Sequence, residues 1–471
     1  MLLALISCAC AAAAATRPHY GGTLRVTMQS SPNALVLPAA SDPTAYWDIA
    51  RILSLVGDNL VRIDAEDRPQ PALATGWQRD STARHWQFSL RRGVKFHDGS
   101  LASPSAIAQI LGSLHPNWTV RVSAGTMNLN SNFPSTEPPV KDLLTIDTDV
   151  PDQSLLAELA LPRNLIVTRN ADGIPIGTGP FRVMEFQPGK SLTLVSSDES
   201  WSGRPFIDGV EIEFGKSVHE QALALELGRA DLVEAAPEAA LRARVSSSLS
   251  TELMALVFTA NSNAQDARVR EALALSIDRK PIQFVLLKGA AEPAASILPN
   301  WMTGYGPVFS TQPDLPRAKA LLAESRPRAL TLSYDPRDAQ SQLIAERIAL
   351  NAREVGITVQ VSLSGSDDIR LVRIALVTPD PALALREAAR ELSLAEPVVE
   401  GNGLGNAQGD AVDELYQAEH SLLQGNAIIP LFHLPVASAV GPRVRDWRPD
   451  KLGQWDLADI WLETARLEES R

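Results

Sequence analysis

The stretch Arg84–Leu114, RHWQFSLRRGVKFHDGSLASPSAIAQILGSL, carries the pattern on which the fold assignment rests. Trp86, Phe88 and Leu90 alternate with polar residues, and this period of two predicts a half-buried β-strand. A second alternating segment at 94–96 follows after a turn. The first half of the stretch therefore predicts a β-hairpin.

The second half of the same stretch predicts an amphipathic helix. Ser103 is a favourable N-cap residue, and Pro104 suits the first helical position, where no backbone N–H is needed. The apolar residues that follow recur at helical spacing and are expected to form one buried face. They are Ile107, Ile110, Leu111 and Leu114.

Length and composition predict a globular protein with more than one core. A chain of 471 residues exceeds one typical core, so two or more lobes are expected. Its 45% hydrophobic and 21% charged residues are ordinary values for a globular protein. A formal net charge of −12 argues against a surface for nucleic acid or anionic membranes, which would require basic patches.

The N-terminus predicts export from the cytoplasm. Residues 1–15 are apolar, small and uncharged, which is typical of a signal peptide with an Ala-x-Ala cleavage site near Ala13–Ala15. The alternative is a lipoprotein signal with Leu5–Cys8 as lipobox and a lipid anchor at Cys8. Both cysteines, Cys8 and Cys10, lie here, so the remaining chain can form neither a disulfide nor a cysteine zinc site. A periplasmic or other extracytoplasmic location is expected.

Three motifs resemble one protein family. The segment FSLRRGVKFHDG at 88–99 is similar to a segment of the extracellular solute-binding proteins of family 5, the dipeptide, oligopeptide and nickel receptors of ABC importers. IGTGPF at 176–181, followed by WSGRPFID at 201–208, resembles a second family segment. DARVREALALSIDR at 266–279 resembles a third. The resemblance covers most of residues 21–465 and is weak at 362–408.

The resemblance implies a two-lobed α/β fold of the periplasmic-binding-protein type (type II, cluster C-like), with an extra α+β subdomain inserted in lobe one. The hinge is expected near Asn261 and near Pro435–Gly441. The implied boundaries are 16–50, 177–255 and 438–471 for the core of lobe one, 51–176 for the inserted subdomain and 256–437 for lobe two, after a signal peptide at 1–15.

The sequence carries no motif that predicts an enzyme or a cofactor site. His219-Glu220 lacks the second histidine of a zinc-protease helix, and there is neither a Gly-x-Ser-x-Gly elbow nor a phosphate loop. His97 and His433 lie in family-like motifs, where a hydrogen-bonded structural role is expected. Ligation of nickel or haem is the alternative, since some relatives bind such cargo.

The function that the resemblance implies is capture of a small molecule or peptide in the cleft between the lobes. The lobes close on the ligand, and the closed form docks on an ABC permease and ATPase complex. The chain is expected to act as a monomer without nucleic acid. Candidates for the cleft wall, each with a structural role as the alternative, are Ser30, Ser31, Asn261, Trp301, Arg373 and Asp380.

One segment departs from the peptide-binding relatives. They carry a tryptophan and then an acidic residue before an Asp-Pro or Glu-Pro pair, and that carboxylate binds the α-ammonium group of the peptide. Here the pair is Asp380-Pro381, but the two preceding positions align with about Ile374 and Val377. A missing ammonium anchor predicts a neutral, N-blocked or anionic ligand, or lost binding.

Two other classes of function stay open at this point. A receptor or extracytoplasmic chaperone built on the same scaffold would need no permease. A hydrolase would need a nucleophile and base that no motif of this sequence supplies.

Overall fold

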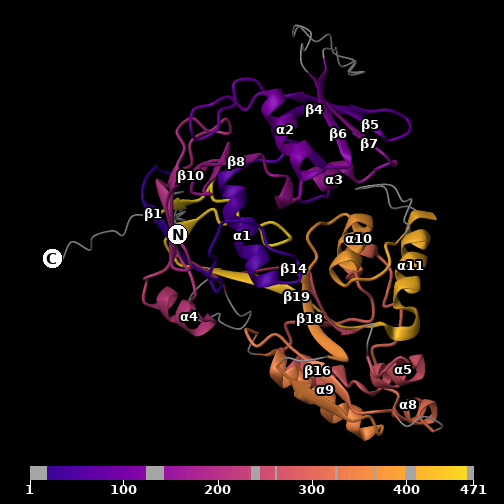
Figure 1. Ribbon diagram of the computed structural model, residues 1–471. Helices are drawn as coiled ribbons and strands as arrows, with labels where there is room; N and C mark the ends of the chain where they lie inside the picture. Colours follow the sequence, from indigo (N-terminus) through magenta and orange to yellow (C-terminus); the bar gives the residue numbers. More distant parts are fainter. Residues whose placement is uncertain are drawn as a thin grey trace, which may run out of the picture.

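The structure is a computed structural model that describes residues 18–123, 143–234, 244–259, 262–323, 327–338, 340–363, 367–397 and 410–463. The predicted signal peptide at 1–15 and the candidate Asn261 lie outside these residues. Two lobes stand beside each other, joined by the long strands β14 (Arg244–Phe258) and β19 (Ile428–Val440) (Figure 1). Among the described residues, no helix combines the length and apolarity needed to cross a membrane.

One large mixed sheet runs through both lobes. The described residues give it eleven strands, ten of them in the order β10-β11-β12-β1-β13-β19-β14-β18-β16-β17, with β15 paired to β19. Its other strands are β1 (Thr23–Thr27), β10 (Phe181–Gln187), β11 (Ser191–Ser196), β12 (Gly209–Glu213), β13 (Leu232–Glu234), β15 (Glu292–Pro293), β16 (Leu330–Ser333), β17 (Val359–Ser362) and β18 (Ile369–Ala375).

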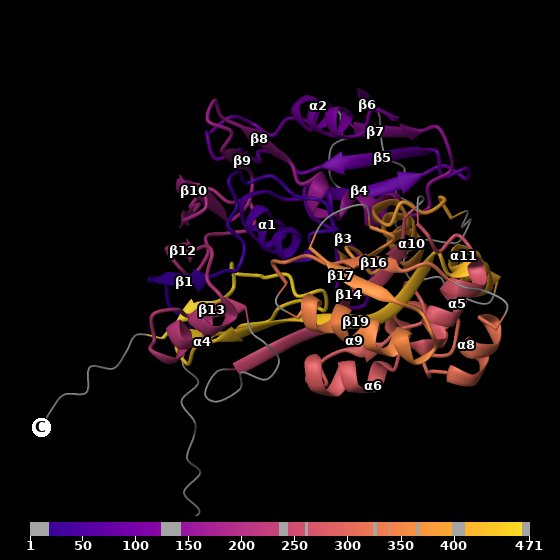
Figure 2. The same ribbon diagram turned by 60° about the horizontal axis from the view of Figure 1, so that its bottom comes forward.

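The strands β14 and β19 are shared between the lobes. The first residues of β14, Arg244–Ser247, pair with the end of β19, which also pairs with β13 of the first lobe. The later residues Glu252–Phe258 pair with the start of β19 and with β18 of the second lobe. Figure 2 shows the two strands lying side by side. Their register shifts between Ser247 and Glu252, within the span where the lobes join.

The subdomain that contains the opening stretch has its own sheet and core. Its strands follow the order β4 (Ala74–Arg79), β5 (His85–Leu90), β7 (Leu143–Thr148) and β6 (Trp118–Ser123). Trp86 and Phe88 of β5 are buried, which confirms the predicted strand. The second hairpin strand was wrong: residues 94–96 form only a β-bridge between Lys95 and Leu101, because turns flank them on both sides.

The helix α2 (Pro104–Leu114) confirms the predicted capping. Ser103 Oγ accepts a hydrogen bond from Ala106 N at 3.2 Å, and Pro104 occupies the first turn. Only part of its apolar face is covered, however. Ile107 and Leu111 pack in the subdomain core, whereas Leu114 is 45% exposed.

The remaining elements complete the two lobes. The first lobe also holds α1 (Pro43–Val56), β2 (Val61–Ile63), β3 (Pro69–Pro71), α3 (Leu155–Leu159), η1 (Pro162–Asn164), β8 (Val167–Arg169), β9 (Pro175–Gly177), α4 (Val218–Glu226), β20 (Val444–Arg445) and β21 (Trp461–Leu462). The second lobe holds α5 (Ala267–Ser276), α6 (Arg279–Pro281), η2 (Ile282–Leu286), α7 (Asn300–Thr303), α8 (Leu315–Leu321), α9 (Ser341–Glu354), α10 (Pro381–Glu391), α11 (Asp410–Leu423) and η3 (Gln424–Asn426). The residue boundaries assigned to the lobes stay a prediction.

The Gly-Thr-Gly motif at 177–179 has a packing reason. The backbone at Gly177 and Gly179 lies against the C-terminal end of α1, and Gly179 N donates to Val56 O at 2.9 Å. A Cβ atom at Gly177 would lie 2.1 Å from Val56 O, and one at Gly179 would lie 2.7 Å from Leu55 O. Side chains at these positions would push β9 away from α1.

Gly177→Ala is therefore expected to destabilise the protein by about 1–3 kcal/mol or more, because the added methyl group overlaps a backbone carbonyl. Urea unfolding measures this loss. Gly112→Ala is the matched control, since nothing lies within 4 Å of a Cβ at that helical position. The control should be neutral or slightly stabilising. Equal effects of the two substitutions would contradict the packing argument.

Candidate functional site

The two lobes meet at an apolar contact. From the first lobe come Tyr46, Trp47 and Ala50 of α1, together with Ala157 of α3. From the second lobe come residues that include Ala375 and Val377, and all of them are at least nine-tenths buried. Ala375 N also donates a backbone hydrogen bond to Ala40 O at 2.8 Å. We call this region, with the polar pairs described next, the interlobe contact.

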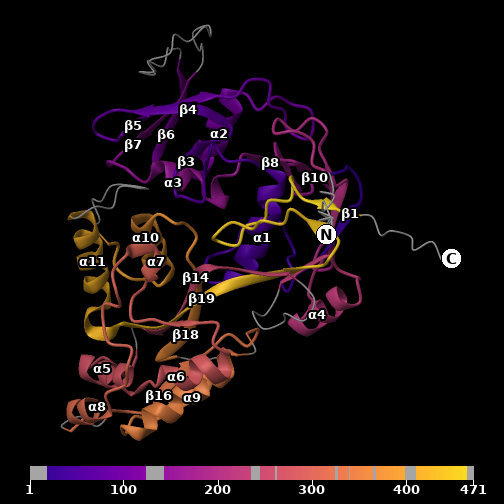
Figure 3. The same ribbon diagram turned by 180° about the vertical axis from the view of Figure 1, so that it is seen from behind.

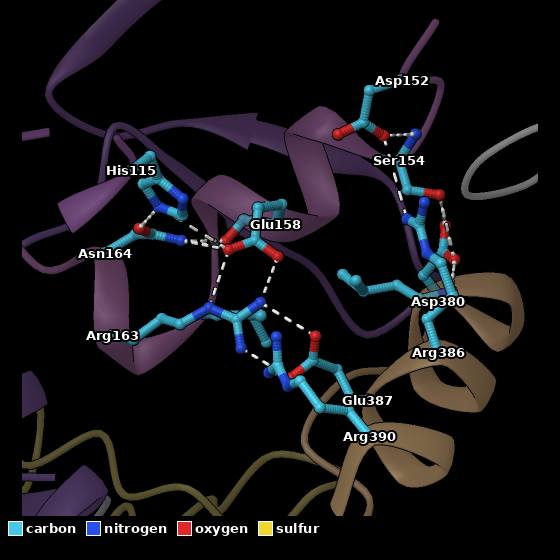
Figure 4. A network of polar contacts seen from close by, with 12 residues as sticks. His115, Asp152, Ser154, Glu158, Arg163, Asn164, Asp380, Arg386, Glu387 and Arg390 are labelled. Atoms are coloured by element: carbon cyan, nitrogen blue, oxygen red, sulfur yellow. Dashed lines mark hydrogen bonds and ion pairs between the residues drawn. The ribbon is translucent and has the colours of Figure 1, made fainter. Parts of the chain in front are cut away.

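An ion pair ties the first lobe to α10. Arg163 Nη1 donates to Glu387 Oε2 at 2.6 Å and Arg163 Nη2 to Glu387 Oε1 at 3.1 Å, so the guanidinium is bidentate (Figure 4). Arg163 Nε also donates to Glu158 Oε1 at 2.8 Å. Asn164 Nδ2 donates to the same oxygen of Glu158, and Arg390 pairs with Glu387. One arginine thus bridges carboxylates of both lobes.

Burial and charge act in opposite directions on these groups. Burial by itself would raise the pKa of Glu158, but the hydrogen bonds and charge of Arg163 outweigh it, and the pKa lies below its ordinary value. Burial by itself would lower the pKa of Arg163. The hydrogen bonds and charges of Glu387 and Glu158 outweigh burial and raise this pKa above its ordinary value, so the guanidinium stays charged. Glu158 and Arg163 are therefore both ionised at neutral pH.

A second polar connection lies at the start of α10. Asp380 is 1% exposed and caps this helix, accepting from Leu383 N at 2.8 Å. Ser154 Oγ, just before α3, donates to the same carboxylate at 3.3 Å. Arg386 and Asp152 approach to 3.9 Å beside it. Seen from behind, α3 lies next to α10 across the lobe boundary (Figure 3).

A cavity of about 860 Å³ borders the interlobe contact, between α2 and α10; we call it the α2–α10 cavity. Its walls come from the segment 36–40, from α1, from the exposed side of α2, from η1 and β8, and from α10. The residues that line it include Val36, Gln109, Ile110, Ser113, Leu114, Arg163, Arg169, Val377, Glu387, Arg390 and Glu391.

The predicted site residues do not converge on this cavity. Ser30 N donates to Asp48 Oδ2 at 3.2 Å, and the neighbouring Ser31 lies beside Gly215. Arg373 pairs with Glu252 and with Asp338.

The other two described candidates lie nearer the lobe boundary. Trp301 Nε1 donates to Ser250 O at 2.9 Å and packs against the apolar cluster of the interlobe contact, while Asp380 caps α10 as described. None of the five described candidates lines the cavity, and Asn261 is outside the described residues. Their assignment to a ligand site stays a prediction.

Arg163, Glu158 and Glu387 could not be predicted from the sequence, since no local pattern marks the pairing of Arg163 with a carboxylate more than 200 residues away. The segment around Val377 did carry a signal. It was singled out because it departs from peptide-binding relatives, and Val377 lines the cavity.

Both family-motif histidines make structural hydrogen bonds. The Nε2 atoms of His97 and His433 lie 2.9 Å from Gly179 O and 3.0 Å from Ile297 O, respectively. Burial lowers the pKa of His433 to about 4. Within the described ranges, no group of three or more His, Cys, Asp or Glu side chains is placed to hold a metal ion.

Comparison with known proteins gives a family match over 68–371, to the bacterial extracellular solute-binding proteins, family 5 Middle. The nickel-binding periplasmic protein of Escherichia coli is 26% identical, over 67% of this chain and 66% of that protein. Heme-binding protein A of Haemophilus influenzae is 25% identical, over 54% and 53%. The chain thus spans less than two thirds of these relatives. A probable di/tripeptide-binding protein of Pseudomonas aeruginosa is 22% identical over 98% and 99%.

Solved structures share the architecture. NikA from Staphylococcus aureus in complex with Ni(L-His)2 aligns with a TM-score of 0.75 at 15% identity, covering 94% of this chain and all of that chain. The oligopeptide-binding protein AppA from Bacillus subtilis, in complex with a nonapeptide, aligns with a TM-score of 0.74 at 17% identity, covering 95% and 100%. This likeness confirms the predicted two-lobed α/β fold.

Arg163→Ala is expected to cost about 3–5 kcal/mol of unfolding free energy, because Glu158 would be left buried without its arginine and Glu387 would lose one of its two arginines. Arg68→Ala is the control, since Arg68 is 64% exposed and pairs with Asp64 and Glu66 at the surface, so its loss should change stability little. Chemical denaturation measures both.

The stabilities of wild type and Arg163→Ala can also be compared as a function of pH. The pKa of Glu158 is depressed in the folded state, so its stabilisation is present above the unfolded pKa, about 4.3, and is lost as pH falls below it. The stability difference between wild type and Arg163→Ala should therefore shrink below about pH 4. A difference that is constant with pH would contradict the ionic origin.

His433 should make stability fall on acidification. Its pKa is about 4 when folded against about 6.5 when unfolded, so the unfolded chain binds the extra proton between these values. Going from pH 7 to pH 5 should cost on the order of 2 kcal/mol through this group, and His433→Gln should remove that part of the slope. The exposed His219→Gln is the control, and an identical slope in both variants would refute the assignment.

Proposed function

Since the chain belongs to the bacterial extracellular solute-binding proteins of family 5, we propose that it captures a solute outside the cytoplasmic membrane for an ABC import system. The observation that carries the proposal is a cavity large enough for a small solute, lined by residues of both lobes. Ligands held at such a boundary touch both lobes at once.

The physical basis of capture is differential affinity. A solute in the α2–α10 cavity contacts the 36–40 segment and α2 on one side and α10 on the other. Moving the lobes apart would break one set of contacts, so the bound solute favours the closed arrangement by its difference in affinity between the two states. A permease that recognises the closed form then receives loaded receptor preferentially.

The partners and the location belong to the same proposal. An ABC permease and its ATPase receive the solute, the receptor acts as a monomer, and no catalytic step occurs. Residues 1–15 direct export, ending either in cleavage near Ala13–Ala15 or in lipid attachment at Cys8. The six residues predicted from the sequence remain candidates for parts of the cleft that a ligand reaches when the lobes open.

A second candidate is a receptor or chaperone that does not serve transport. The observation that favours it is the extent to which the chain's own groups hold the lobes together. The Arg163–Glu387 pair, the Ser154–Asp380 hydrogen bond and the apolar cluster all cross the boundary. Closure maintained in this way would not report the presence of a solute.

Thermal unfolding of the protein purified from residue 16 and stripped of ligand tests the proposal. The panel holds free dipeptides, N-acetylated peptides, sugars, nickel and haem. A true ligand should raise the melting temperature, because binding at a hundredfold excess over Kd adds about 2.7 kcal/mol of stability.

Small-angle scattering with and without the ligand that binds then separates the two candidates. Transport predicts an apo form that opens. No melting shift with any member of the panel, together with a closed apo form, would reject solute capture and favour the second candidate.

A further inference from the structure

The α2–α10 cavity exposes apolar side chains that the sequence pattern assigns to a covered face. Leu114 belongs to the apolar stripe of α2, yet it is 45% exposed, and Ile110 is only half-buried. Val36, across the cavity, is 55% exposed. Each lines the cavity. Apolar groups gathered around a hollow gain free energy when an apolar partner displaces water from them.

The cationic groups at the cavity are already engaged. Arg163 is bidentate to Glu387 and also bound to Glu158, and Arg390 pairs with Glu387 (Figure 4). Arg169 donates to the backbone carbonyls of Gly173 and Leu35. A ligand carboxylate would have to compete with these intramolecular partners, so the cavity offers an anion little net gain.

Two carboxylates line the cavity: Glu387 is unfavourable for an ammonium group, and Glu391 is the position to test. Glu387 is shared by two arginines, and Val377 presents an apolar side chain, 7% exposed and packed in the interlobe cluster. Glu391, at the end of α10, also lines the cavity and is half-buried. An ammonium ion placed against Val377 would lose hydration without gaining a partner.

Neutral polar groups of a ligand, in contrast, find hydrogen-bond partners in the cavity. Gln109 and Ser113 of α2 line the same wall as Ile110 and Leu114. Ser113 Oγ already donates to Ile110 O at 2.7 Å and can therefore only accept from a ligand, so the amide of Gln109 is the group that can both donate and accept. Such groups hydrogen-bond to uncharged amides without the desolvation cost of an ion. The volume of about 860 Å³ lies in the range that small ligands of this type occupy.

We infer that the α2–α10 cavity binds an uncharged, largely apolar solute with amide groups, of the type of an N-acylated peptide amide, in preference to a zwitterionic peptide. The inference rests on the proposed solute-capture function and specifies its ligand class. The solute contacts Val36 and Leu114 with its apolar parts and reaches Gln109 with an amide.

The test is isothermal titration with N-acetyl-leucyl-leucine amide and, separately, free leucyl-leucine. The capped compound should bind at least tenfold more tightly, since it brings no charge into the cavity. Equal or tighter binding of the zwitterion would overturn the inference. Loss of that binding in Glu391→Gln would then identify Glu391 as an ammonium anchor.

Variants locate the site. Leu114→Asp and Val36→Asp place a charge on side chains that are already 45% and 55% exposed, so the fold should tolerate them. Each should weaken capped-peptide binding at least tenfold. Leu350→Asp, on the second lobe's α9 and 51% exposed, is the matched control and should bind as wild type. Unchanged binding in both cavity variants would refute the location.

The outcomes separate this inference from the proposed function. Binding of nickel, haem, a sugar or a free dipeptide without the capped peptide would overturn the ligand class and leave solute capture standing. Absence of binding by every probe would reject both.

Discussion

The bidentate contact between Arg163 and Glu387 is the interaction on which the arrangement of the two lobes depends. It joins residues 224 positions apart, and it is sheltered: the two side chains are 30% and 11% exposed. A partly buried ion pair adds little net stability, because its Coulomb energy is largely offset by the cost of desolvation. Any arrangement of the lobes that leaves one of the two charges buried without its partner is nevertheless strongly disfavoured. The Arg163–Glu387 pair therefore mainly determines the relative arrangement of the two lobes. It restricts how α10 can sit against η1, and the apolar cluster completes the contact between the lobes.

The same restriction explains where the cavity lies. Tyr46, Ala375 and Val377 fill the space between the lobes with close-packed side chains, so the open volume is found beside this cluster. A receptor with an acidic side chain at Val377 would have a charged, hydrated point there instead. In this chain Val377 instead packs in the apolar cluster and contributes to the wall of the cavity.

The sequence predicted the local elements well because their causes are local. Alternation at Trp86 and Phe88, and capping by Ser103, depend on near neighbours, and the structure confirms both. Two expectations went further than local pattern allows. The strand at 94–96 was wrong, and the helical stripe could not reveal that Leu114 would stay uncovered.

Long-range partners are the part that the sequence could not supply. Glu158, Arg163 and Glu387 follow no motif, and only the fold brings them together. Asp380 was chosen from an Asp-Pro pair, and its observed contacts are those of a helix cap that also holds Ser154. The missing acidic residue near Val377 stays a prediction, and the structure adds that Val377 lines the α2–α10 cavity.

The shared strands β14 and β19 have a mechanical consequence. A flexible two-stranded linker would let the lobes swing as on a door hinge, but here the linking strands are hydrogen-bonded to each other over most of their length and to strands of each lobe. Separation of the lobes must therefore be accommodated largely as torsion of a continuous ribbon, and elastic energy is stored in strand twist. The pairing is irregular at Ser247–Glu252 and again at Met254–Ala255, where local twist is increased. We therefore expect lobe motion to be a twist of the shared strands rather than a free swing about one point.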